Sequence, residues 1–236
     1  MTLSEPLVVG VPILNRADLA ARMVESVDVA ARLVVVVNGR PDSIVPHVAG
    51  AVAANPAVVD VDWVMPARNL GVAASWNAII RTHPEAPRWV IVNADITFAA
   101  GDLAHVADVE GPGVWCLKEF AAFALTPDTV DTVGWFDENF HPIYYEDNDY
   151  RRRCQLAGVP VVDIESGAKH LTSSTIHSGF WGHNQRTFPQ NGAYYHDKWG
   201  GMPGREQHDT PFASGMPVDW WRLDRNRIVQ LAWEDR

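Results

Sequence analysis

The chain has 236 residues and a formal net charge of −10. This length fits one large domain, or one domain with an appendage, and is enough to bury a substantial core. The acidic balance excludes a general nucleic-acid binder, which needs a broad basic surface, although it permits a local basic pocket.

Cysteine usage and the length of the apolar runs indicate the compartment. Cys116 and Cys154 lie far apart without metal-ligand spacing, so we expect reduced structural thiols in a cytoplasmic protein. Residues 1–6 are polar and acidic, which predicts no signal peptide. No apolar run reaches the length that spans a bilayer, so we expect at most peripheral membrane contact through aromatic residues near the C-terminus.

The first half of the chain alternates apolar β-branched runs with amphipathic stretches. Strands are predicted at residues 7–12, 33–38, 58–64 and 89–92, the third with the apolar–polar alternation of a strand near a sheet edge. Two helices are predicted from apolar faces made of Leu19, Met23, Val24 and Val27, and of Val72, Trp76, Ile79 and Ile80. The alternation predicts βαβ units and a parallel α/β sheet, in which ligands collect at the carboxyl ends of the strands.

The second half begins with short strands, predicted at residues 114–117, 123–125 and 159–164. Before the last of these a helix is predicted, with solvent-facing arginines at 151–153 and a stop at Gly158. Its apolar face consists of Tyr150, Cys154 and Ala157.

The tail from Ser166 onward is rich in Gly, Pro, His and Trp. Residues 199–204 predict a loop, either a mobile lid or an ordinary connection, and residues 218–231 predict a terminal helix. Several side chains here are candidates to contact a bound ligand, although at least half of them are expected to pack in the core: Trp181, His183, Tyr194, Tyr195, Trp199 and Trp220.

Carboxylates gather at the start of the predicted acidic helix, at Glu146, Asp147 and Asp149. We expect them to stay ionised, because the backbone N–H groups and the dipole at a helix N-terminus favour negative charge. An ionised, positioned carboxylate is what a general base needs. The alternative is that Asp147 only caps the helix, since Asp is a preferred N-cap residue.

A second polar cluster is Asn93-Ala94-Asp95, which directly follows a buried strand. A carboxylate placed there can hold Mg²⁺ or Mn²⁺ that bridges phosphates, whereas the alternative is an aspartate that caps a turn. His170 follows the last predicted strand; a lone histidine there is more often packed or on the surface, and it becomes a candidate ligand in company with Asp95.

A series of segments in fixed order resembles the inverting family 2 glycosyltransferases with the GT-A fold. These segments are residues 9–16, 36–39, 67–77, 93–95 in the place of the DxD motif, 134–137, and the acidic helix. The resemblance covers about residues 7 to 175. It implies a GT-A (Rossmann-like), mostly parallel central sheet flanked by helices. Residues 1–175 would form the nucleotide-sugar-binding and catalytic domain, and residues 176–236 an extension that completes the acceptor side without being an independent domain.

The resemblance also implies roles for individual residues. The nucleotide would be bound by Pro12, Asn15, Asn38, Arg68, Asn69, Gly71 and Asn93, with Asn77 supporting the 68–71 loop. Asp95 would ligate the metal together with His170, and Asp147 would be the catalytic base. The sugar or acceptor would be approached by Trp135, Phe136, Asp137 and Glu146.

Two positions depart from the family pattern. Val37 stands where many members have a base-binding aspartate, which leaves uridine, thymidine and guanosine nucleotides open, with UDP- or dTDP-sugars favoured and GDP-sugars possible. Asn93 replaces the first DxD aspartate, which implies a modest metal affinity that depends on the diphosphate.

Together these features predict a metal-dependent, inverting glycosyltransferase of the hexosyl type. It would use Mn²⁺ or Mg²⁺ and move a single sugar from a nucleoside-diphosphate sugar to a hydroxyl of a glycan, glycolipid or protein. One alternative is a sugar-nucleotidyltransferase. That class requires a Gly-rich basic loop after the first strand, where this chain has only Gly10 and Arg16. The other is an inactive carbohydrate- or nucleotide-binding module, favoured by Asn93 and opposed by Asp95 and Asp147.

Overall fold

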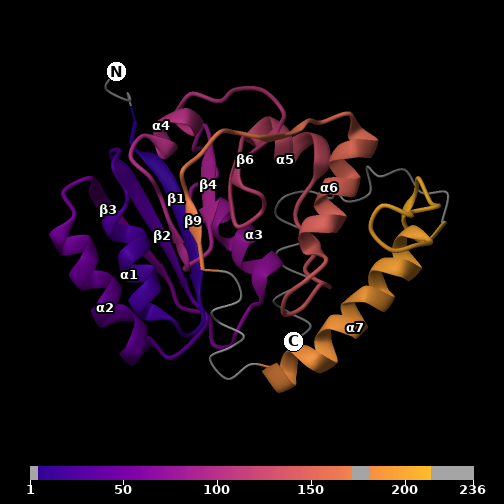
Figure 1. Cartoon of the computed structure of the whole chain (residues 1–236), viewed down its shortest axis with the longest axis horizontal. Helices are drawn as coiled ribbons and strands as arrows, with labels where there is room; N and C mark the ends of the chain where they lie inside the picture. The colour runs from indigo at the N-terminus through magenta and orange to yellow at the C-terminus, as the bar shows by residue number, and fades with distance from the viewer. Residues whose placement is uncertain (1–4, 172–180, 214–236) are drawn as a thin grey trace.

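The computed structural model describes residues 5–171 and 181–213 (Figure 1). The α/β alternation predicted for the first half is confirmed. Its elements are β1 (Leu7–Ile13), α1 (Ala17–Glu25), β2 (Ala31–Val37), α2 (Pro41–Ala54), β3 (Val58–Val64), α3 (Val72–Thr82) and β4 (Trp89–Val92). The later elements are β5 (Ile96–Thr97), α4 (Asp102–Ala107), β6 (Val114–Lys118), β7 (Ala122–Leu125), α5 (Pro127–Val133), α6 (Glu146–Ala157), β8 (Val161–Asp163), β9 (Lys169–His170), α7 (Trp181–Trp199) and a short 3-10 helix (Pro211–Ala213).

Seven strands form one central sheet in the order β3-β2-β1-β4-β7-β6-β8. Strand β7 is antiparallel to both of its neighbours, β4 and β6, and the other pairs are parallel. The sheet is therefore mostly parallel, as expected, and β3 lies at its edge, which explains its alternating sequence. A separate two-stranded sheet pairs β5 with β9 and joins two distant parts of the chain.

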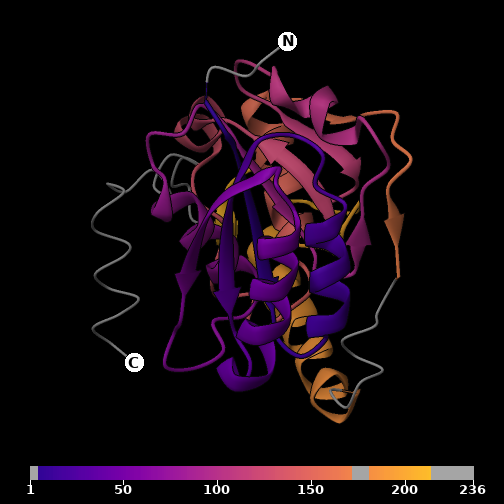
Figure 2. The same ribbon diagram turned by 90° about the vertical axis from the view of Figure 1, so that its left-hand side faces the viewer.

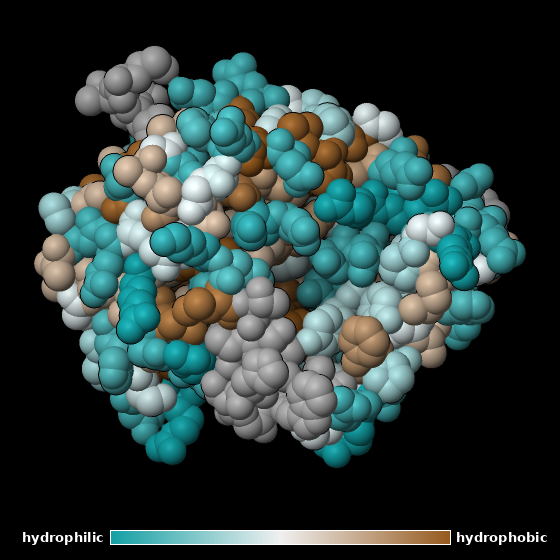
Figure 3. Space-filling model, in the orientation of Figure 1, coloured by the Kyte–Doolittle hydropathy of each residue, from teal (hydrophilic) through white to brown (hydrophobic). Residues whose placement is uncertain are grey.

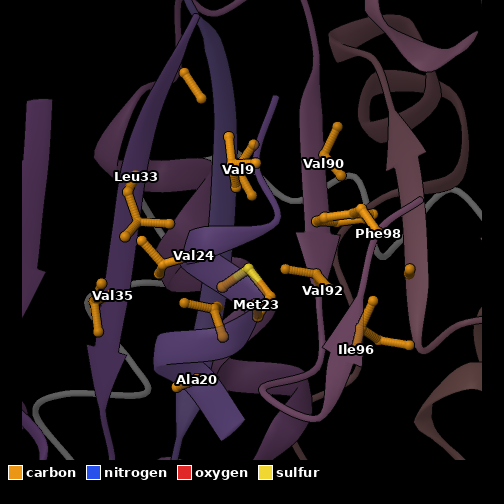
Figure 4. Close-up of a cluster of buried hydrophobic side chains, with 14 of the residues drawn as sticks. Val9, Ala20, Met23, Val24, Leu33, Val35, Val90, Val92, Ile96 and Phe98 are labelled. Atoms are coloured by element: carbon orange, nitrogen blue, oxygen red, sulfur yellow. The ribbon is translucent and has the colours of Figure 1, made fainter. Parts of the chain in front are cut away.

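Both faces of the central sheet are covered by helices. Side chains of α1, α2 and α4 pack on one face, where Met23 and Val24 meet Leu33 and Val35 of β2 (Figure 4), and Figure 2 shows α1 and α2 side by side in front of the strands. Helices α3, α5 and α6 pack on the other face. Fully burying an aliphatic side chain of this size contributes about 1.5–3 kcal/mol, so the two layers account for much of the stability.

Four helices were not predicted from the sequence, namely α2, α4, α5 and α7. Helix α2 starts with Pro41 in its first turn and buries Ile44, Val48 and Ala51 at helical spacing, a pattern that was available in the sequence. Helix α7 contains Gly182, Pro189 and Gly192, so its composition resembled that of a loop.

The acidic helix is confirmed as α6, which buries Tyr150 and Cys154 and ends at Gly158 with a φ of 68°. Two details of the prediction are wrong. Ala157 is exposed, and Arg153 does not face solvent: it is fully buried beside Asp149, with 2.9 Å between Nε and Oδ2. The carboxylate of Asp149, one helical turn earlier, compensates the charge of the buried Arg153 guanidinium.

The face in Figure 3 is hydrophilic over most of its area, with hydrophobic side chains in small areas only. Within residues 5–171 and 181–213, no helix has the length and apolar character needed to cross a membrane. Residues 200–204 form bends and turns after α7, as the loop prediction required, while the predicted helix at 218–231 and Trp220 lie outside the described residues.

Candidate functional site

The carboxyl ends of β1 and β2 meet at one edge of the sheet. The Asn38 N–H donates to the Ile13 carbonyl at 2.8 Å, and a β-carbon at Gly39 would collide with the Leu14 carbonyl oxygen. Glycine is needed there because the two backbones approach so closely. The loops that carry Asn15 and Asn38 are thus neighbours, while Pro12 lies half-buried in β1 beside Val36 of β2.

The Asn38 side chain organises the loop that follows β3. Its Oδ1 accepts the Leu70 N–H at 2.9 Å, and its Nδ2 donates to the Ser75 hydroxyl at 2.8 Å. Both ends of the amide are therefore engaged with the protein. Asn38 therefore links the end of β2 to the 68–71 loop, and its side chain has this structural role at the candidate nucleotide site.

The 68–71 loop has a tightly fixed backbone. The Asn69 Oδ1 accepts the Gly71 N–H at 2.9 Å, and Gly71 has a φ of 78°, a conformation that favours glycine. A β-carbon at Gly71 would also lie 2.8 Å from the Pro142 carbonyl oxygen. Arg68, in contrast, is exposed. The loop therefore holds Arg68 on the surface at the same edge of the sheet as Asn38.

Asp95 and His170 are brought together by the small sheet. Ile96 of β5 pairs with His170 of β9, and the Leu171 N–H donates to the Asp95 carbonyl at 3.1 Å. The Asp95 Oδ1 and the His170 Nε2 lie 3.2 Å apart, in side chains that are 11% and 20% exposed. Arg16 belongs to the same neighbourhood, because its pKa is raised first by the hydrogen bonds to Asp18 and further by the charge of Asp95.

These two side chains would fit a divalent cation whose remaining ligands came from a bound molecule or water. Two ligands at adjacent octahedral corners, each about 2.1 Å from the ion, stand about 3 Å apart, close to the observed separation. A carboxylate oxygen with an imidazole nitrogen would suit Mn²⁺, which needs further oxygen ligands from outside these two residues. Among the described residues no group of three His, Cys, Asp or Glu side chains could hold a metal by itself. Asn93 lies half-buried just before Asp95, at the end of β4.

Asp147 lies in the first turn of α6, but it does not cap the helix. The cap position is Tyr145, with no side-chain cap, and the Asp147 Oδ1 accepts the N–H of Asn148 at 2.8 Å. The helix is preceded by two non-glycine residues in the left-handed region, Tyr144 with a φ of 82° and Tyr145 with a φ of 72°. Each such residue costs on the order of 1–3 kcal/mol and persists only where its surroundings enforce it.

The electrostatics of the carboxylates differ from the sequence-based expectation. Burial raises the pKa of Asp147, against the opposing Asn148 N–H and the charge of Arg151. Burial raises the pKa of Glu146 well above its ordinary value, and the neighbouring Asp147 raises it further. Desolvation therefore outweighs the favourable helix terminus, and ionisation is harder than we expected. A base whose pKa is raised toward the working pH is a stronger proton acceptor.

The segment at 135–138 is largely internal. Asn77 donates to the Phe136 carbonyl at 2.9 Å and accepts the Phe136 N–H at 3.0 Å, so it fixes this segment and not the 68–71 loop. The Phe136 ring stacks on Tyr150 with 4.0 Å between centroids, and Trp135 is buried under the Arg81 guanidinium. These contacts position the segment in the core, and a contact between these rings and a sugar stays a prediction.

Asp137 belongs to a buried ionic network that the sequence did not indicate. Its Oδ2 lies 2.7 Å from the Lys198 Nζ and accepts the Tyr194 hydroxyl at 2.9 Å. Burial alone would raise the pKa of Asp137, but the Lys198 ammonium outweighs it and holds that pKa below its ordinary value. Lys198 also lies 2.6 Å from the Asp149 Oδ1, which accepts the indole N–H of Trp199 at 2.9 Å.

Tyr195 and Trp199 are fully buried, so the structure places these two aromatic candidates in the core and not at an acceptor. Lys198 and Asn191 are the functional candidates that the sequence reading missed. The signal available for them was the spacing of buried positions along α7, which only becomes visible once that segment is recognised as a helix.

Comparisons with known proteins agree with this architecture. A protein of Leishmania donovani named "Galactofuranosyl glycosyltransferase" is 34% identical over 143 residues, which is 50% of this chain and 32% of that protein. The chain thus spans about a third of the length of this relative. No protein-family model matches the chain.

Solved structures carry the same fold at low sequence identity. GalNAc-T7, solved with UDP, GalNAc and Mn²⁺, gives a TM-score of 0.57 at 10% identity, over 94% of this chain and 55% of that chain. TarS of S. aureus gives a TM-score of 0.51 at 12% identity, over 69% and 36%. A TarS 1-349 structure in complex with UDP gives 0.50 at 13% identity, over 69% and 59%. The fold that the motif resemblance implied is confirmed, because the chain shares the GT-A fold of these structures.

Proposed function

We propose that this chain is a metal-assisted glycosyltransferase that moves one sugar from a nucleoside-diphosphate sugar to an acceptor hydroxyl with inversion. The observation that carries the proposal is the meeting of Asp95 and His170 beside the carboxyl end of β4, with 3.2 Å between the two candidate ligand atoms. Open α/β sheets bind ligands at this edge.

UDP is the favoured nucleotide of the donor. It is bound in structures of two proteins with the same fold, GalNAc-T7 and TarS. The name of the Leishmania relative makes galactofuranose the first sugar to test. The proposed acceptor is a glycan, glycolipid or protein hydroxyl, and a cytoplasmic location stays a prediction that the buried free thiols of Cys116 and Cys154 support.

Asp95 and His170 would hold the cation, and Asn38 would keep the 68–71 loop in place beside the nucleotide. When bound, a divalent cation acts as a Lewis acid and neutralises charge on the leaving diphosphate. Arg16, whose charge acts on Asp95, would add a fixed positive charge to the same region.

Asp147 would take the proton of the acceptor hydroxyl as that oxygen bonds to the anomeric carbon. The bond from that carbon to the diphosphate breaks on the opposite face, so the configuration inverts without a covalent intermediate. The half-buried position of Asp147 supports this role, because the raised pKa that desolvation causes makes its carboxylate a better base. Glu146, whose pKa is raised further, would stay protonated over a wider pH range and could donate a hydrogen bond to a sugar hydroxyl without giving up its proton.

The proposal is tested with a thermal-shift panel of UDP-, dTDP- and GDP-sugars, including UDP-galactofuranose, with Mn²⁺ and with a chelator. A ligand that binds only the folded state raises the unfolding temperature in proportion to its occupancy. We expect a UDP-sugar to stabilise the protein in Mn²⁺ far more than in chelator, and Asp95→Ala to remove that difference. Equal shifts in both conditions for the unmutated protein would contradict the metal-assisted reading.

Release of UDP from the same donor then separates an enzyme from a binding module. We expect slow donor hydrolysis by the unmutated protein in Mn²⁺, because water can replace the acceptor. A donor that binds but is never cleaved, with any hydroxyl acceptor tried, would favour the inactive module.

A further inference from the structure

Residues 143–145 form an unusual backbone connection into α6. Tyr144 and Tyr145 are consecutive non-glycine residues at φ values of 82° and 72°, and Glu146 and Asp147 follow them directly. Left-handed residues with large side chains persist only where other contacts enforce them, and they occur preferentially at functional sites. The question is which contacts enforce them here.

Asn191 of α7 supplies the polar contact. Its Nδ2 donates to the Ile143 carbonyl at 2.9 Å and lies 3.3 Å from the Tyr144 carbonyl oxygen. Asn191 is only 5% exposed, so these hydrogen bonds are shielded from competing water. A single side-chain amide therefore ties the middle of α7 to the carbonyls at the start of the left-handed pair.

The ring of Tyr145 is held by the same helix. It packs against Phe188 and Tyr195, with centroid distances of 5.3 and 5.7 Å. A β-carbon at Gly192 would lie 3.0 Å from the Tyr145 hydroxyl oxygen, so the ring rests on the bare backbone of α7. Phe188 also meets the Tyr144 ring edge-on at 5.0 Å.

The C-terminal end of α7 is anchored to α6 itself. Lys198 and Trp199 both contact the Asp149 carboxylate, which lies in the first turn of α6. Helix α7 thus contacts the acidic helix at its first turn and the connection just before it, and Figure 1 shows the two helices next to each other.

We infer that α7 enforces the left-handed backbone conformation of Tyr144 and Tyr145. Asn191 is then a positioning residue, because this backbone fixes the position and direction of the Glu146 and Asp147 side chains at the start of α6. The inference rests on the proposed function, because it assigns α7 a role in sugar transfer although this helix contributes neither of the candidate metal ligands. Asn191 acts through the backbone and does not itself meet the substrate.

The first test compares Asn191→Ala with Gln190→Ala, the exposed neighbour on the same helix. Misplacing a reacting group by about 1 Å can cost about a hundredfold in rate. We therefore expect kcat for donor cleavage in Asn191→Ala to fall by about tenfold to a hundredfold, with the KM for the UDP-sugar little changed, and Gln190→Ala to behave as the unmutated protein. A loss confined to protein stability, with kcat per folded molecule unchanged, would overturn the positioning role.

A second readout does not depend on activity. The Glu146 carboxyl is followed by carbon NMR as a function of pH in the unmutated protein and both variants. Burial raises the pKa of Glu146, and the charge of the neighbouring Asp147 raises it further. If the start of α6 is displaced, water should reach the Glu146 carboxyl and lower its pKa. We expect the shift in Asn191→Ala and not in Gln190→Ala; identical titrations in all three proteins would overturn the inference.

Gly192→Ala and Gly182→Ala form a second matched pair, useful if Asn191→Ala unfolds. A β-carbon at Gly182 meets nothing within 4 Å, whereas one at Gly192 presses on Tyr145. We expect Gly192→Ala to lower kcat and Gly182→Ala to leave it unchanged. If the unmutated protein cleaves no sugar nucleotide, the proposed function fails, and the Glu146 titration still decides whether α7 holds the start of α6.

Discussion

The region around β1, β2 and α1 and the region between α6 and α7 are held together by different interactions. Around β1, β2 and α1 the packing is aliphatic, with Val9, Leu33 and Val35 fully buried against Met23. Between α6 and α7 it is ionic and aromatic, with Asp149 and Lys198 fully buried. Aliphatic packing tolerates small changes, whereas a buried charge left without its partner is strongly destabilising. The position of the candidate base at the start of α6 therefore depends on specific charged partners, whereas the packing of the sheet does not.

The largest effect is expected from Asp147→Asn, which keeps the size of the side chain and removes its basicity. Transfer to an acceptor should fall by about two to four orders of magnitude, the usual contribution of a positioned acid or base. Donor binding, measured by thermal shift, should survive. Asp149→Asn is unsuitable as a control, because Asp149 is buried between Arg153 and Lys198.

Asp128→Asn is the better control for Asp147→Asn. Asp128 is exposed and lies in the first turn of α5, so it shares the helix position without the candidate site. Near-normal transfer by Asp147→Asn with a true acceptor would remove the central residue of the proposed mechanism.

Lys198→Met tests the ionic side of the comparison. It leaves Asp137 and Asp149 buried without their shared ammonium, and breaking a buried ion pair costs about 3–5 kcal/mol. We expect that loss in the free energy of unfolding, measured by urea denaturation. Arg40→Met, at a side chain 84% exposed, should change it by less than about 0.5 kcal/mol. A Lys198→Met protein as stable as the unmutated one would show that the network contributes little.

Leu33→Ala tests the aliphatic side. Removing a buried leucine side chain should cost about 2–5 kcal/mol of stability, while the matched change Val59→Ala, at an edge residue 55% exposed, should cost much less. At temperatures well below unfolding, kcat per folded Leu33→Ala molecule should stay near normal. A large fall in kcat there would mean that the two regions are not independent.

The smallest effect is expected from Glu146→Gln, and it depends on pH. The native pKa of Glu146 is raised above the ordinary value of 4.5, so its ionisation opposes folding as the pH rises past that value. The variant and the unmutated protein should unfold at similar temperatures below pH 4.5, and the variant should be the more stable near neutral pH. A difference of the opposite sign near neutrality would contradict the burial of this carboxyl.

The strands and the fold class were predictable because β-branched runs and their alternation directly report burial. Asp95 and His170 could be paired only through the family resemblance, since nothing local indicates that β5 and β9 combine. The helix α7 was missed because glycine and proline lower helix propensity, and tertiary contacts at Tyr195 and Trp199 override that preference. The raised pKa values of Glu146 and Asp147 were not predictable, because desolvation depends on what covers the carboxylates.

The buried contact between Lys198 and Asp149 has a practical consequence for dissecting the protein. A fragment cut at residue 175, where the family resemblance ends, would keep every motif residue from Pro12 to His170. It would lose the ammonium on which Asp137 and Asp149 depend and the amide that binds the Ile143 carbonyl. A fragment that keeps the surroundings of the candidate residues therefore has to extend beyond the last recognisable motif, at least to Trp199.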